Sequence, residues 1–116
     1  MVGLTSHGSA HGRFTRAIQQ RNLFAAEVAL REMRNPSLLV ALDYVVLLAD
    51  ARPDKFDVAA IRWHGRLELE TATLTLAESQ LALAALGALR AGDSEAAAVL
   101  KRLLRKTRPT LLPRAI

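Results

Sequence analysis

The chain of 116 residues contains no cysteine, and aromatic residues make up only 4% of it. The absence of cysteine excludes disulfides, thiolate metal sites and thiol nucleophiles. No segment reaches the roughly 18 consecutive apolar residues that a membrane-spanning helix needs, and the N-terminal residues lack the hydrophobic run of a secretory signal. We therefore expect a single cytoplasmic domain, large enough to bury one core, with no membrane partner.

Acidic residues are also few, since 16 Lys and Arg face 11 Asp and Glu and give a net charge of +5. The stretch from Lys101 to Arg114 carries six basic residues and no acidic one. As a helix it has one basic and one apolar face, which suits an anionic surface such as a phosphate backbone or, as the less favoured alternative, lipid headgroups. Basic faces are also often merely solvated, and the absence of aromatic residues after Trp63 weighs against nucleic-acid recognition. The candidate nucleic-acid contacts are Lys101, Arg102, Arg105, Lys106 and Arg108.

The segment from Pro53 to Glu70 carries two apolar stripes on opposite faces of a helical wheel. One stripe consists of Phe56, Ala59, Ala60, Trp63 and Leu67. The other consists of Val58, Ile61, Gly65 and Leu69. A helix with two opposed apolar stripes packs between other elements. We therefore predict that this segment is the middle helix of the domain, with neighbours on both faces and with Trp63 in the core.

Stops and caps divide the chain into helical segments. Asn35-Pro36 and Arg52-Pro53 are breaks, because the residue before a proline leaves the α region. Thr75 and Glu78 form a capping-box pattern that starts a helix, and Ala91-Gly92 is a C-cap that ends it. The predicted helical segments are 13–34, 37–51, 53–70, 76–90 and a last one that starts at Asp93 or Ser94 and stops at Arg108.

The short connections predict an all-α domain in which successive helices are antiparallel neighbours, arranged as a helical-hairpin stack or a small bundle. We expect about five helices in one domain over residues 13–108, a flexible arm over 1–12 and a tail over 109–116. Residues 13–34 are either one helix or two, because two different apolar stripes meet at Arg21-Asn22.

Three stretches, 21–33, 52–65 and 91–104, each place a small or polar break before an alanine-rich amphipathic helix. Their spacing resembles that of tetratricopeptide-type helical hairpins, which repeat about every 34 residues, although the Trp, Gly, Tyr and Pro positions of that repeat are not matched. The region from Leu38 to Leu89, especially AAIRWHGRLELE and LTLAESQLALAALGAL, also resembles a class of small helical proteins of actinobacteria. This second resemblance implies a lineage and a compartment, and it implies no activity.

His64 is the only histidine inside a predicted helix, and it lies on the wheel beside Asp57 and Glu68. A neighbouring carboxylate orients a histidine ring and raises its basicity, which is one part of a general-base site. No activated nucleophile, phosphate loop or zinc motif accompanies it, so an ordinary surface pair of His64 with Glu68 is the favoured interpretation. His7 and His11 have a spacing found in metal sites, but no third ligand lies near them. We expect no catalytic residue, metal or cofactor.

Hydrophobic residues exceed what a core of this size requires. The segments 37–51 and 76–90 are apolar nearly all round, and 53–70 has two apolar faces, so the remaining helices cannot surround all three. We therefore expect a surface that binds another protein or a second copy of the chain. The candidate interface residues are Leu39, Val46, Leu81, Leu83, Leu86 and Leu89. The sequence favours a non-enzymatic binding or regulatory module, in a homodimer, over a nucleic-acid-associated protein and over an enzyme centred on His64.

Overall fold

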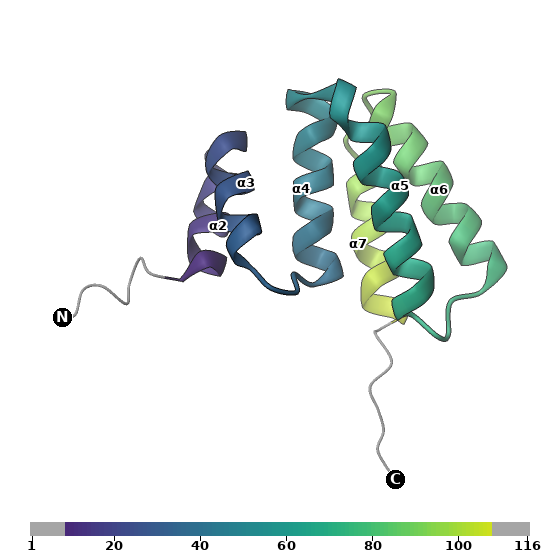
Figure 1. Cartoon of the computed structure of the whole chain (residues 1–116). Coiled ribbons are helices and arrows are strands. Elements are labelled where there is room, and N and C mark those ends of the chain that lie inside the picture. The colour runs from purple at the N-terminus through teal and green to yellow at the C-terminus, as the bar shows by residue number, and fades with distance from the viewer. Residues whose placement is uncertain (1–8, 108–116) are drawn as a thin grey trace, which may run out of the picture.

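The computed structural model describes residues 9–107 as six α-helices with short connections (Figure 1). The helices are α2 (Ala10–Gln19), α3 (Leu23–Glu32), α4 (Leu38–Ala51), α5 (Pro53–Glu70), α6 (Leu76–Arg90) and α7 (Ala96–Thr107). Residues 9–107 contain no strand, so the predicted all-α class is confirmed. Arg108, the predicted tail over 109–116 and residues 1–8 of the predicted arm lie outside the described residues.

The first predicted segment is two helices, which is why six helices stand where about five were expected. Arg21 has a φ of 55°, a left-handed conformation that ends α2. The side chain of Asn22 then accepts a hydrogen bond from the amide of Ala25 and caps the start of α3. α2 also begins earlier than predicted, because Ser9 caps it and residues 10–12, assigned to the arm from sequence, form its first turn.

The helix ends at α6 follow the local signals in the sequence. The hydroxyl of Thr75 accepts the amide of Glu78, and the carboxylate of Glu78 accepts the amide of Thr75, so the capping box is confirmed. Gly92 has a φ of 101°, and the amides that follow the helix bond back to the carbonyls of Ala88 and Leu89. This is a Schellman motif, in which glycine supplies the left-handed residue.

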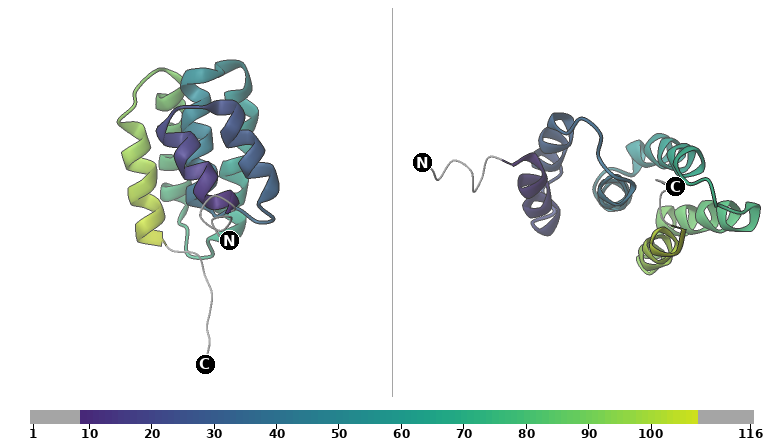
Figure 2. Two further views of the ribbon diagram at one scale, coloured as in Figure 1. Left: turned by 90° about the vertical axis from the view of Figure 1, so that its left-hand side faces the viewer. Right: turned by 90° about the horizontal axis from the view of Figure 1, so that it is seen from below.

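Two hydrophobic clusters share helix α4. α2 and α3 lie on one side of it, and α5, α6 and α7 lie on the other (Figures 1 and 2). Val40 and Leu47 of α4 belong to the first cluster, together with Phe14 of α2. The second cluster receives Leu38, Leu42, Val45 and Leu48 of α4. α4 is therefore the middle helix of the domain.

The prediction that the segment 53–70 is the middle helix is wrong. α5 buries only the stripe that contains Phe56, Trp63 and Leu67, whereas Ile61 and Leu69 on the opposite stripe are 69% and 87% exposed. The reason is the number of helices available, because α2 and α3 cover the outer side of α4 and no other described helix covers the outer side of α5.

Trp63 is fully buried in the second cluster, as predicted. Its indole Nε1 donates a hydrogen bond to the carbonyl of Leu38 at 2.9 Å, which satisfies the polar edge of the ring inside the core. This bond fixes the middle of α5 to the first turn of α4.

Candidate protein-interaction surface

The structure places the predicted interface residues in three different environments. Leu39, Leu81 and Leu83 are exposed, and Val46 is partly buried against the second cluster. Leu86 and Leu89 are core residues with only 4% and 5% of their surface exposed, so their assignment to an interface is wrong. They lie on the side of α6 that packs into the core. The sequence does not identify this side, because α6 has no polar side that would mark its exposed face.

The opposite side of α6 is exposed and carries no charge. The only charged residues of this helix are Glu78 in the first turn and Arg90 at the end. Between them the exposed positions are Gln80, Leu81, Leu83, Ala84 and Gly87. A helix at the surface of a soluble domain normally places charged residues opposite its buried stripe. The uncharged outer side of α6 is therefore the candidate surface for contact with another molecule.

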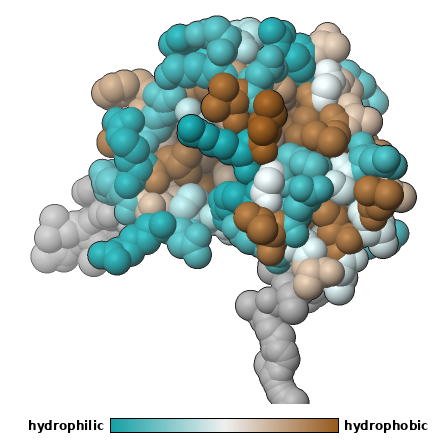
Figure 3. Space-filling model, turned by 45° about the vertical axis from the view of Figure 1, so that its right-hand side comes forward, coloured by the Kyte–Doolittle hydropathy of each residue, from teal (hydrophilic) through white to brown (hydrophobic). Residues whose placement is uncertain are grey.

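The exposed stripe of α5 lies next to this side of α6. Ile61 of α5 and Leu83 of α6 line one open cavity of about 270 Å³ between the two helices. We define the α5–α6 face by the exposed large apolar residues Ile61 and Leu69 of α5 and Leu76 and Leu83 of α6. The exposed Val58 lines the cavity between α4 and α5 instead. Figure 3 shows several separate hydrophobic patches on this side of the molecule, with hydrophilic residues between and around them. Leu76 was absent from the sequence-based candidates, and Ile61 and Leu69 of α5 were assigned to the interior.

Two glycines open the α5–α6 face to close contact. A methyl group placed on Gly65 or on Gly87 would meet no atom within 4 Å. The backbone of another helix can approach α5 and α6 closely at such positions. An ion pair between Asp57 and Arg90, at 3.3 Å, links the two helices at the same cavity. Large apolar side chains, open backbone positions and one polar bridge thus occur together on this face.

His64 is buried between α5 and α6, and the prediction that it lies on the surface is wrong. Its Nε2 lies 3.1 Å from the carbonyl oxygen and 3.0 Å from the hydroxyl of Ser79. Because a carbonyl can only accept, Nε2 carries the proton and donates it to Ser79. The hydroxyl of Ser79 in turn donates to Glu68 at 2.7 Å, and Nδ1 of His64 lies 3.9 Å from the other oxygen of Glu68.

This network contains a histidine, a serine and a carboxylate but lacks the arrangement of a nucleophilic site. A histidine that acts as general base accepts a hydrogen bond from the serine hydroxyl, whereas the hydroxyl of Ser79 donates its hydrogen bond to Glu68. His64 and Ser79 do not line any of the five cavities described for residues 9–107. The network links α5 to α6 beneath the α5–α6 face. The sequence did not reveal the role of Ser79, because this residue lies on another helix from His64.

The basic residues of α7 remain mostly available. Arg102, Arg105 and Lys106 are exposed and form no salt bridge within residues 9–107. Lys101 instead forms an ion pair with Asp43 of α4 at 3.4 Å, which fastens α7 to the middle helix. Three of the predicted cations are thus exposed on α7, although Arg105 also lines a cavity toward α4. The pKa of Glu78 on α6 is lowered mainly by the hydrogen bond from the amide of Thr75 and also by the charge of Lys106, which lies near it. The predicted fifth, Arg108, lies outside the described residues.

Within residues 9–107 no group of three or more His, Asp or Glu side chains is placed to hold a metal ion. His7 lies outside the described residues, so its spacing with His11 is not described. None of the helices in the described range is long and apolar enough to cross a bilayer. Comparison of the chain with models of protein families, with curated proteins and with solved structures finds no match.

Proposed function

We propose that the chain is a non-enzymatic interaction module that self-associates through the α5–α6 face. The observation that carries this proposal is the outer side of α6, where every exposed position between Glu78 and Arg90 is uncharged. The adjoining stripe of α5 enlarges the same surface with Ile61 and Leu69.

The energetics favour burial of this face. Ile61, Leu69 and Leu76 are each more than two-thirds exposed. Complete burial of one such side chain contributes about 1.5–3 kcal/mol, part of which offsets the loss of freedom on association. Four exposed apolar side chains and two open glycine positions on one face suit a twofold contact in which the same face of each copy is used.

The order of the helices supports a second copy as the partner. In our proposal the pairs α2–α3, α4–α5 and α6–α7 form the antiparallel helical-hairpin stack that the sequence predicts. The pair at the end of such a stack needs a polar outer surface to remain soluble alone. The outer side of α7 carries the charged residues Arg102, Arg105 and Lys106, whereas the outer side of α6 carries no charged residue. A second copy would cover the outer side of α6 in both chains at once.

Sedimentation equilibrium of the full chain tests this proposal. Leu83→Glu places a charge in the α5–α6 face at an exposed position, so folding should be retained while self-association is lost. Phe24→Glu is the matched control, because Phe24 is also a large exposed apolar residue and lies on α3, away from this face. We expect the native chain and Phe24→Glu to associate and Leu83→Glu to remain monomeric. A monomeric native chain, or association that survives Leu83→Glu, would contradict the proposal.

Nucleic-acid binding is the second candidate, and the specific observation in its favour is the free cationic side of α7. The double charge reversal Arg102→Glu/Arg105→Glu should weaken binding to a duplex oligonucleotide and flatten its dependence on salt. The matched double reversal Arg16→Glu/Arg34→Glu alters exposed arginines elsewhere. Equal loss in both double variants would indicate only non-specific attraction to a basic protein.

A further inference from the structure

A second surface lies between α3 and α5, with α4 beneath it. A cavity of about 450 Å³ opens between α4 and α5, and another of about 370 Å³ opens between α3 and α4. Both cavities are lined by Tyr44 and Lys55, so they adjoin each other. We call the two together the α3–α5 groove. It lies on the other side of α5 from α6. It is separate from the cavity between α5 and α6 that Ile61 and Leu83 line.

The floor of the α3–α5 groove is apolar. It consists of Ala41, Val45 and Leu48 of α4 with Ala59 and Trp63 of α5. The span from Ala41 to Leu48 corresponds to about two turns of helix. Because the indole of Trp63 is held by its hydrogen bond to a backbone carbonyl, this floor is fixed before any ligand binds. It can receive the apolar side chains of a short segment.

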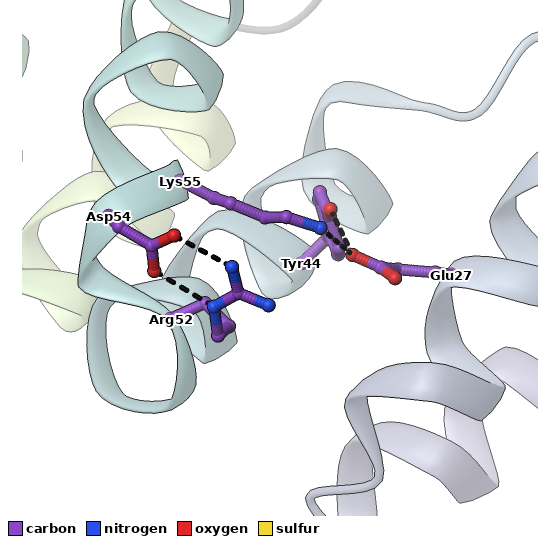
Figure 4. A network of polar contacts seen from close by, with 5 residues as sticks. All are labelled: Glu27, Tyr44, Arg52, Asp54 and Lys55. Carbon is purple, nitrogen blue, oxygen red and sulfur yellow. Dashed lines mark hydrogen bonds and ion pairs between the residues drawn. The ribbon is translucent and has the colours of Figure 1, made fainter.

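Both acidic residues that line the groove already have partners (Figure 4). The carboxylate of Glu27 accepts a hydrogen bond from the hydroxyl of Tyr44 at 2.8 Å and lies 3.6 Å from Nζ of Lys55. Asp54 accepts two hydrogen bonds from the guanidinium of Arg52, at 2.7 and 2.8 Å. These pairings leave the acidic groups of the lining neutralised.

The cations of the groove are in excess. Arg31, Lys55, Arg62 and Arg66 all line it, and Arg31 and Arg62 form no ion pair within residues 9–107. The ion pair of Lys55 with Glu27 is long and partly exposed, so exchanging it for another carboxylate costs little. The groove therefore presents uncompensated positive charge along the edges of an apolar floor.

We propose that the α3–α5 groove binds an acidic amphipathic helix of another protein. Apolar side chains of that helix would contact the floor beside Trp63, and its carboxylates would meet Arg62 and Lys55. This is the helix-in-groove mode of recognition, with charge added to shape. Charge also selects the occupant, because the unpaired cations at the edges of the groove attract a segment rich in carboxylates. A phosphate chain matches less well, since it has nothing to place on the apolar floor.

Trp63 is the only tryptophan of the chain and lines the groove, so its fluorescence reports occupancy directly. The probe is a synthetic helix-forming peptide of about 14 residues, roughly four turns, with leucine along one side and glutamate along the other. A peptide with lysine in place of glutamate and a dT oligonucleotide are titrated in parallel. All titrations use Leu83→Glu as the background, so that self-association does not enter the signal and failure of either proposal is seen separately.

We expect saturable binding of the glutamate peptide, no binding of the lysine peptide, and an affinity reduced about tenfold by Arg62→Glu. Arg102→Glu makes the same charge change on α7 and should leave the affinity unchanged. The proposal is overturned if the glutamate peptide does not bind, if both peptides bind equally, or if both arginine variants weaken binding alike. It is also overturned if the oligonucleotide binds in preference to the peptide and depends on Arg62, because the groove would then be a phosphate site.

Discussion

Helices α4 and α5 resemble each other in sequence pattern and differ in what covers them. Each carries apolar residues on two opposite sides. On α4 both sides are buried, since Val40 and Leu47 face the first cluster while Leu42 and Leu48 face the second. On α5 one side is buried and the side with Ile61 is exposed.

The difference between the two helices teaches what a two-stripe pattern can establish. The pattern predicts that both sides of a helix are removed from water, but it does not specify whether the same chain does so. α4 finds its second cover in α2 and α3, whereas α5 has no further helix of its own chain on that side. An apolar stripe left without a cover is thereby evidence for contact with another molecule.

The largest expected effect is a difference in stability between a variant in the second apolar stripe of α4 and a variant in the second apolar stripe of α5. Leu47→Ala removes a buried side chain of α4 and should lower the free energy of unfolding by about 3 kcal/mol. Ile61→Ala removes an exposed side chain of α5 and should change the stability of the monomer by no more than about 0.5 kcal/mol. Urea denaturation at low protein concentration measures both. Similar losses in the two variants would show that α5 is as enclosed as α4.

A smaller effect concerns how the two helices begin. Ser37 caps α4, because its hydroxyl accepts the amide of Val40 at 3.1 Å. α5 has no side-chain cap and starts with Pro53 in its first turn. Ser37→Ala should therefore cost about 1 kcal/mol of stability in thermal or urea unfolding. Arg52→Ala, at the start of α5, should cost less, and a larger loss there would mean that the exposed contact with Asp54 stabilises the helix more than a cap does.

The smallest expected effect is a shift in the pKa of Tyr44, which lies on α4 at its contact with α3. Burial, reinforced by the hydrogen bond to Glu27, raises the pKa of Tyr44 from 10.0 to about 12. The folded state thus favours the neutral phenol, so this stabilisation is complete below pH 10 and is lost as the pH rises from 10 towards 12.

Tyr44 is the only tyrosine, so the near-ultraviolet absorbance of tyrosinate follows it alone. Glu27→Gln should lower its pKa part of the way to the ordinary value, because the carboxylate charge is removed while burial remains. Arg31→Gln is a useful control, since the cation of Arg31 lowers the pKa of Tyr44 and its removal should raise it. An unchanged midpoint in Glu27→Gln would show that the contact between α3 and α4 is not maintained in solution.

The sequence predicted the features that depend on neighbouring residues. The capping box of Thr75 and Glu78, the glycine turn at Gly92 and the break before Pro36 are local, and the structure contains them. Arg21-Asn22 was identified as a junction, but the stripes alone did not decide between a bend and a break. An N-capping role for Asn22, typical of that residue type, was the available signal for a new helix.

The features that depend on distant residues were harder to predict. α6 is apolar nearly all round, so no polar side indicated that Leu86 is buried while Leu83 is exposed. His64 meets Ser79 only because α5 packs on α6, and the groove at Tyr44 exists only because three helices meet there. Periodicity gives the sides of each helix, whereas the choice of neighbour is made by the whole fold.

The central claim is that the exposed stripe of α5 is covered by a second copy of the chain. Because the chain has no cysteine, a single Ile61→Cys gives one thiol whose labelling rate can be followed as protein concentration rises. Phe24→Cys on α3 serves as the exposed reference. We expect the Ile61→Cys thiol to be labelled rapidly in dilute protein and slowly in concentrated protein, while the labelling rate of the reference does not change. A labelling rate at position 61 that is independent of concentration would contradict the claim.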